Sequence, residues 1–212
     1  MARLKLGVLI SGRGSNLSAI SQACASPDYP AEIALVVCNR ANAPGIAIAR
    51  QAGHGIEIVD HGAFADRAAF DADVTNRLRA ASVEVVCLAG FDRLFSPAMF
   101  DAWPDRIVNI HPSLLPSFKG LGRRVHEQAL QAGVKVSGCT VHFVRLAMDS
   151  GPIIAQACVP VAEGDTPDSL AQRVLAAEHR LYPAAIALIA EGRVQIDGAV
   201  ARVAAPDGAP PR

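Results

Sequence analysis

The sequence predicts an α/β fold: a mostly parallel, twisted sheet with helices on both faces and an antiparallel extension towards the C-terminus. Short apolar runs alternate with longer segments of helical periodicity through the first part of the chain, and this alternation is typical of β-α-β units. After residue 111 two alternating runs follow one another across a short turn, which favours a hairpin. Hydrophobic residues make up 51% of the 212 residues and charged residues 19%, so we expect a globular core rather than disorder.

Five apolar runs in the N-terminal part predict strands. They are LKLGVLI (4–10), EIALVVC (32–38), GIEIVD (55–60), VEVVCLAG (83–90) and RIVNI (106–110). The segments 15–25, 43–53 and 63–81 lie between the first four runs and carry apolar residues at helical spacing. We expect Ser15 or Asn16 near the N-cap of the first helix, and a glycine after the second helix to end it. This order of strands and helices is typical of a Rossmann-like sheet.

The remaining sequence departs from this alternation. Its expected elements are a Pro- and Gly-rich loop (112–122), a helix near 125–132, a hairpin of the runs 135–144 and 152–161, a long helix over 166–192 and a last hairpin over 193–203 with an Asp-Gly turn. Thr166 is expected to cap the long helix with Pro167 at its first position, and Pro183 to interrupt or kink it. We therefore expect one domain over residues 1–203 and a disordered tail over 204–212.

Charge and cysteine content argue against several classes of protein. The 20 basic and 20 acidic residues give a formal net charge of zero, so nothing indicates attraction to nucleic acid or to an anionic membrane. The five cysteines are widely spread and form no CxxC pair, which favours buried free thiols in a reducing compartment over a zinc site. No apolar run reaches the ~18 residues of a membrane span. We expect a cytoplasmic monomer or homodimer that binds small molecules, without nucleic acid, membrane or metal.

The stretch GVLISGRGSN (7–16) begins as a strand and ends in a glycine-rich turn. Gly12 and Gly14 would let an anion approach the backbone, and the following helix offers unpaired N–H groups. A dinucleotide fingerprint needs a third glycine where this chain has Leu17, and an acidic residue near Cys-Asn-Arg (38–40). The turn therefore predicts a site for one phosphate monoester, or else a strand-to-helix turn without a ligand.

A second unusual stretch, NIHPSLLPSFKG (109–120), begins at the end of the fifth expected strand. Asn109 and His111 alternate along the extended chain, so both side chains can point to one side of the sheet. An amide is a hydrogen-bond donor and a histidine changes charge near neutral pH, so the pair suits acyl transfer with proton movement. A structural role for a single histidine is the alternative.

Six motifs occur in an order that resembles one enzyme family. They are ISGRGSN, LAGFDRLFSP, NIHPSLLPSFKG, GCTVHFV, MDSGPIIAQ and AEHRLYP. Over residues 4–195 the chain resembles the phosphoribosylglycinamide formyltransferases. The resemblance implies formyl transfer from 10-formyltetrahydrofolate, a cosubstrate, to the amine of 5'-phosphoribosylglycinamide in purine synthesis, without a metal. A formyltetrahydrofolate deformylase-like hydrolase and a catalytically weakened folate-binding relative are the alternatives, and a nicotinamide-dependent oxidoreductase is a more distant one.

The resemblance also implies which residues act. The catalytic set is Asn109, His111 as the proton carrier and Asp149. The residues implied for phosphoribosylglycinamide are Gly14, Ser15, Asn16 and Glu178. Those implied for the folate are Arg67, Asp92, Arg93, Leu94, Phe95 and Asn109. Without the resemblance, Asp149 is a turn residue, Glu178 a surface carboxylate and Arg67 part of a solvated helix face.

Other positions are expected to be structural or depart from the family pattern. We expect His142 to be structural or to support a neighbouring side chain, and His126 and His179 to be exposed or to cap a helix. The stretch LGRRVH (121–126) is longer than in the family and adds two arginines. Arg-Leu-Ala (145–147) stands where more polar or proline-containing residues are expected, and Asp92 where an apolar residue is usual. These departures affect the expected folate contacts more than the catalytic set.

Overall fold

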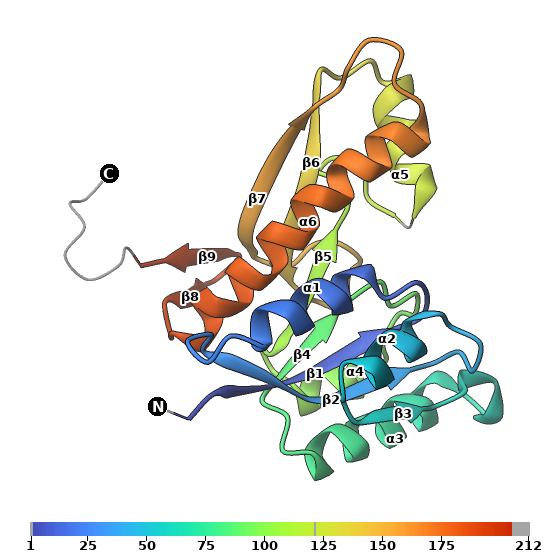
Figure 1. The fold of residues 1–212 in the computed structure, drawn as a ribbon, viewed down its shortest axis with the longest axis vertical. Helices are drawn as coiled ribbons and strands as arrows, with labels where there is room; N and C mark the ends of the chain where they lie inside the picture. The colour runs from blue at the N-terminus through green and yellow to red at the C-terminus, as the bar shows by residue number, and fades with distance from the viewer. Residues whose placement is uncertain (1, 121, 205–212) are drawn as a thin grey trace.

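The computed structural model describes residues 2–120 and 122–204, and a seven-stranded sheet runs through it in the order β3-β2-β1-β4-β5-β6-β7 (Figure 1). The strands are β1 (Leu4–Ile10), β2 (Ala31–Cys38), β3 (Ile56–Ile58), β4 (Val85–Leu88), β5 (Ile107–His111), β6 (Val136–Phe143) and β7 (Ile153–Pro160). Strands β1 to β5 are parallel to one another, whereas β6 is antiparallel to both β5 and β7. The α/β, Rossmann-like fold with an antiparallel extension is thus confirmed.

Helices cover both faces of this sheet. They are α1 (Ser15–Cys24), α2 (Gly45–Gln51), α3 (Arg67–Ala80), α4 (Pro97–Ala102), α5 (Arg123–Gln131) and α6 (Pro167–Ala190), with a short 3-10 helix at His61–Ala63. Apolar side chains of α1, α2, α5 and α6 form the core on one face, and those of α3 and α4 the core on the other. Figure 1 shows α1 beside α6, and β6 and β7 extending past the parallel strands.

The strand order places the carboxyl ends of β1, β4 and β5 next to one another. The chain runs outward from β1 through β2 and β3, and then returns to add β4 and β5 on the other side of β1. Ligands of such sheets bind where the order reverses, beyond the carboxyl ends of the strands. Tyr182 of α6 is fully buried, and its hydroxyl lies 3.1 Å from the carbonyl oxygens of both Leu88 and Val108. This contact ties α6 to the end of β4 and to the start of β5.

The C-terminal expectations are largely confirmed. The β6–β7 hairpin forms, and β8 (Val194–Asp197) and β9 (Val200–Val203) form a separate two-stranded sheet. Thr166 caps α6 in a capping box with Ser169. Pro183 lies inside α6 without ending the helix, so the expected interruption is wrong. Of the tail expected over 204–212, residues 205–212 lie outside the described part of the chain.

Two smaller features differ from expectation. Helix α4 was not expected from the sequence, although Ser96 followed by Pro97 is a helix-start signal. Four of the five cysteines are buried as expected, but Cys158 of β7 is exposed. Within the described residues, no helix is both long enough and apolar enough to cross a membrane.

Candidate active site

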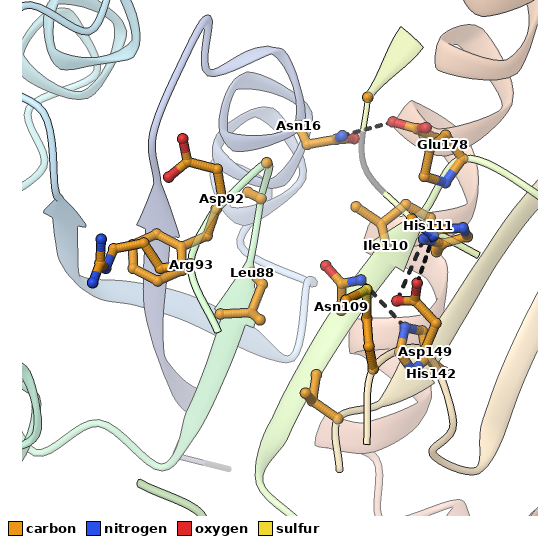
Figure 2. A pocket seen from close by; sticks show the side chains of 18 of the residues that line it. Asn16, Leu88, Asp92, Arg93, Asn109, Ile110, His111, His142, Asp149 and Glu178 are labelled. Carbon is orange, nitrogen blue, oxygen red and sulfur yellow. Dashed lines mark hydrogen bonds and ion pairs between the residues drawn. The ribbon is translucent and has the colours of Figure 1, made fainter. Parts of the chain in front are cut away.

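A cleft of about 830 Å³ lies along the carboxyl edge of the parallel strands. Its walls come from the turn after β1, the segment after β4, the end of β5, the start of α5, the connection from β6 to β7, and one face of α6. Figure 2 shows Asn109, His111, His142 and Asp149 gathered at one place in the cleft, with the pair Asn16 and Glu178 beside them and Asp92 and Arg93 across from them. Segments far apart in the sequence therefore share one cavity.

His111, the last residue of β5, is 2% exposed and held from both sides. Its Nδ1 lies 3.5 Å from Oδ1 of Asp149, and its Nε2 lies 3.1 Å from the carbonyl oxygen of Phe118. A carbonyl oxygen only accepts, so Nε2 donates to it. The carboxylate and the carbonyl thus face the two ring nitrogens and fix the orientation of the imidazole.

Asp149 lies in the connection between β6 and β7 and has a φ of 50°. A left-handed backbone at a residue other than glycine is strained, and such strain is concentrated at functional sites. The Oδ2 atom of Asp149 accepts a 3.0 Å hydrogen bond from the backbone N–H of Gly120, while Oδ1 faces His111. Asp149 therefore joins the end of β5 to the loop that follows it.

Asn109 and His142 lie opposite each other in the antiparallel pair of β5 and β6. Nδ1 of His142 donates to its neighbouring carbonyl, that of Phe143, at 2.9 Å, and Nε2 lies 3.2 Å from Nδ2 of Asn109. Burial lowers the pKa of His142, so the ring is neutral near pH 7 and its Nε2 accepts from the amide. One N–H of Asn109 is fixed in this way, which leaves the second for a ligand.

The glycine turn after β1 opens into the same cleft. Gly14 has a φ of 77° and is the N-cap of α1, without a side-chain cap. Ser15 and Asn16, expected near the N-cap, are the first two residues of the helix. The N–H of Gly45 donates to the carbonyl of Gly12 at 3.0 Å, and this bond fixes the turn against α2. The N–H groups at the start of α1 are available for an anion.

Glu178 of α6 faces the glycine turn. It is 7% exposed, and Nδ2 of Asn16 donates a 2.7 Å hydrogen bond to its Oε2. Burial raises the pKa of Glu178 to about 7, although the bond from Asn16 and the charge of Arg13 act in the opposite direction. The surface-carboxylate interpretation is wrong for this residue. A carboxyl group that titrates near neutral pH can donate to or accept from a bound hydroxyl.

The segment after β4 forms the apolar wall of the cleft. The Phe95 ring stacks on that of Phe91 with centroids 5.5 Å apart, and the Arg93 guanidinium lies 5.5 Å from the ring centre of Phe70. Leu94, Leu146 and Met148, three of the exposed large apolar side chains, also line the cleft. Exposed apolar groups gathered around a cavity indicate a ligand surface.

Residues 4–186 match the formyl transferase family. The chain belongs to the formyl transferase family. It is 42% identical over 193 residues to the phosphoribosylglycinamide formyltransferase of Escherichia coli strain K12. This match covers 91% of this chain and 90% of that protein. It is 48% identical over 194 residues to the trifunctional purine biosynthetic protein adenosine-3 of Gallus gallus, and this match covers 92% of the chain. The chain spans only 19% of the length of that trifunctional relative.

Solved structures give the same relationship. Glycinamide ribonucleotide transformylase 1 from Symbiobacterium toebii superposes with a TM-score of 0.92 at 52% identity, covering 95% of this chain and 94% of that one. Phosphoribosylglycinamide formyltransferase from Anaplasma phagocytophilum superposes with a TM-score of 0.88 at 43% identity, covering 97% and 96%. At these identities the likeness extends beyond the fold alone.

Two residues expected on the folate side, Arg67 and Asp92, have different places in the structure. Arg67, the first residue of α3, is exposed and is not among the residues that line the cleft. Asp92 lines the cleft, but its carboxylate pairs with Arg40 and accepts a 3.1 Å hydrogen bond from Nδ2 of Asn39. The acid that replaces an apolar residue thus has partners at the end of β2. Asp92 links two loops of the site.

Other cleft residues were missed or misjudged from the sequence. His126 of α5 is buried and lines the cleft, so the expected exposure is wrong, and burial lowers its pKa. Arg123 of the longer stretch also lines the cleft and pairs with Asp168 of α6 at 3.1 Å. Arg145 pairs with Asp105 at 2.5 Å. In the described ranges, 2–120 and 122–204, no group of three or more His, Cys, Asp or Glu residues is placed to hold a metal ion.

Proposed function

We propose that the chain transfers the formyl group of 10-formyltetrahydrofolate to the amine of 5'-phosphoribosylglycinamide, a step of purine synthesis. One observation carries the proposal: the set Asn109, His111 and Asp149 lies in a cleft that has a glycine turn on one side and an apolar wall on the other. The turn suits a phosphate ester, and the wall suits a flat aromatic ring. The name of the similar Escherichia coli protein agrees with phosphoribosylglycinamide as the acceptor of a formyl group.

The amine nitrogen forms a bond to the formyl carbon, and the carbonyl π electrons move to the oxygen to give a tetrahedral oxyanion. The intermediate collapses when the bond from that carbon to N10 of the folate breaks. The attacking nitrogen loses one proton and N10 gains one, so no further reactant is needed. Asn109 donates its N–H to the oxyanion, and His111 carries the proton. Asp149 faces Nδ1 of His111 and keeps the imidazole oriented.

The two ends of the cleft hold the two substrates. The backbone N–H groups of Gly14, Ser15 and Asn16 bind the phosphate, and Glu178 binds the ribose or the glycinamide part. Arg93, Leu94 and Phe95 form the surface for the pterin. Arg67 lies outside the cleft lining, so its part is limited to the distal end of a long folate. Asp92 supports the folate surface through Asn39 and Arg40, which follow β2.

We further propose that residues 1–203 form a single domain that acts in the cytoplasm as a monomer or homodimer. Its substrates are the two small molecules named above, with no metal in the reaction. Neither nucleic acid nor a membrane is a partner of this proposed enzyme.

The purified protein should be assayed with 10-formyltetrahydrofolate, with and without phosphoribosylglycinamide. We expect formylated product and tetrahydrofolate only when both substrates are present. Formate released at the same rate without phosphoribosylglycinamide would identify a deformylase-like hydrolase instead. Binding of both ligands without any product would identify a catalytically weakened relative, and either outcome overturns the proposed function.

A further inference from the structure

The segment Ala89–Ser96, which contains Arg93 to Phe95, is held at its first end by β1. The backbone N–H of Ser11, the residue after β1, donates to the carbonyl of Gly90 at 3.2 Å. The hydroxyl oxygen of Ser11 accepts a 3.0 Å hydrogen bond from the backbone N–H of Asp92. These two bonds fix the start of the segment but do not reach its last residues.

A buried acid holds the other end. Asp71 of α3 is 1% exposed, and its Oδ2 accepts a 2.5 Å hydrogen bond from the backbone N–H of Ser96. Asp71 is not among the residues that line the cleft. The adjacent Phe70 belongs to the apolar core of that face and supplies the ring over which Arg93 lies.

Burial of the Asp71 carboxyl group is unfavourable in free energy at this position. A carboxyl group without full hydrogen bonding is costly in an apolar surrounding, and within the described residues Oδ1 of Asp71 has no hydrogen-bond partner. Burial raises its pKa even though the bonds from Ser96 and the charges of Arg67 and Arg93 act in the opposite direction. An apolar side chain would pack there at less cost, so a role for the acid is expected.

We propose that Asp71 is a positioning residue for the folate: it fixes Ser96 and so sets the place of Arg93, Leu94 and Phe95 without touching the ligand. This inference rests on the proposed function, because it names the folate as the ligand of the segment. Asp71 also joins α3 to the start of α4. If Asp71 acted only at that junction, its replacement would lower the stability of the protein without changing the affinity for the folate.

The test compares Asp71→Leu, which removes the acceptor, with Asp71→Asn, which keeps one. We expect Asp71→Leu to raise the KM for 10-formyltetrahydrofolate about tenfold, which corresponds to one buried hydrogen bond, with kcat and the KM for phosphoribosylglycinamide unchanged. Asp71→Asn should largely restore the KM. Asp73→Asn, on the same helix and bonded to Arg77, is the matched control and should leave both constants unchanged.

A folate KM that stays at the wild-type value in Asp71→Leu, with only a lower melting temperature, would overturn the inference. If that variant does not fold, Ser96→Pro removes the donor of the same bond, and the φ of −76° at Ser96 already suits proline. The same increase in KM is then expected, and an unchanged KM again overturns the inference. Fluorescence of Trp103, the single tryptophan and part of the same core, monitors the packing of α4.

Titration with a non-reactive deazafolate separates this inference from the proposed function. If wild-type protein binds the analogue but forms no product from 10-formyltetrahydrofolate and phosphoribosylglycinamide, the proposed function fails, and the dissociation constants of the variants for the analogue still test Asp71. A weaker Kd in Asp71→Leu supports positioning, whereas equal values refute it.

Discussion

Glutamine in place of Glu178 should change how the stability of the protein depends on pH. Burial raises the pKa of Glu178 from its usual 4.5 to about 7, so the folded state favours the protonated acid. Its stabilising contribution is therefore fully present below about pH 4.5 and is lost as the pH rises through about 7. At ~1.4 kcal/mol per pKa unit, the difference between these two pKa values of Glu178 corresponds to on the order of 3 kcal/mol.

Glu178→Gln removes the ionisation and keeps an oxygen that can accept from Asn16. Urea unfolding should be measured for both proteins from pH 4 to pH 8. The unfolding free energy of the variant minus that of the wild type should be larger at pH 8 than at pH 4, by on the order of 3 kcal/mol. Glu163→Gln, at an exposed position of a loop, is the control and should show no such trend. Parallel pH profiles for wild type and Glu178→Gln would refute the reasoning.

Two further changes test the site. Asp149→Asn keeps the shape of the side chain but removes the charge beside His111, so kcat should fall about 10²–10⁴-fold with an unchanged melting temperature; wild-type turnover would show that the acid has no catalytic part. Gly14→Ala should lower the unfolding free energy by about 1–3 kcal/mol, because its φ is +77° and its Cβ would lie 2.7 Å from Cα of Gly45. The neighbouring Gly12→Ala, where a Cβ meets nothing within 4 Å, is its matched control in the same urea titration, and equal losses in the two variants would contradict the strain argument.

The strands were predictable because buried parallel strands are nearly continuous apolar runs. The strand predicted over residues 4–10 has the same bounds as β1, because its side chains belong to the apolar cores on both faces of the sheet. Helix α4 has only six residues, too few for a helical period to be visible. The burial of His126 depends on how α5 packs, which local sequence does not determine.

Within the site, Asn109 and His111 could be found from local sequence because alternation along a strand fixes which side chains share a face. Asp149 required the resemblance, because it reaches His111 through a strained turn in another part of the chain. The contact between Asn109 and His142 depends on the register of two strands. The partners of Asp92 are Asn39 and Arg40, the two residues after β2, so its assignment to the folate alone missed its link to the end of that strand.

The contact between Gly14 and Gly45 also bears on the entropy of ligand binding. Two glycine backbones in close contact and the bond from Gly45 to Gly12 give the turn one shape while it is empty. The loss of conformational freedom therefore occurs when the chain folds, and little of it is left to oppose capture of an anion. Helix α2, which supplies none of the residues lining the cleft, thereby preorganises a recognition element that it does not itself form.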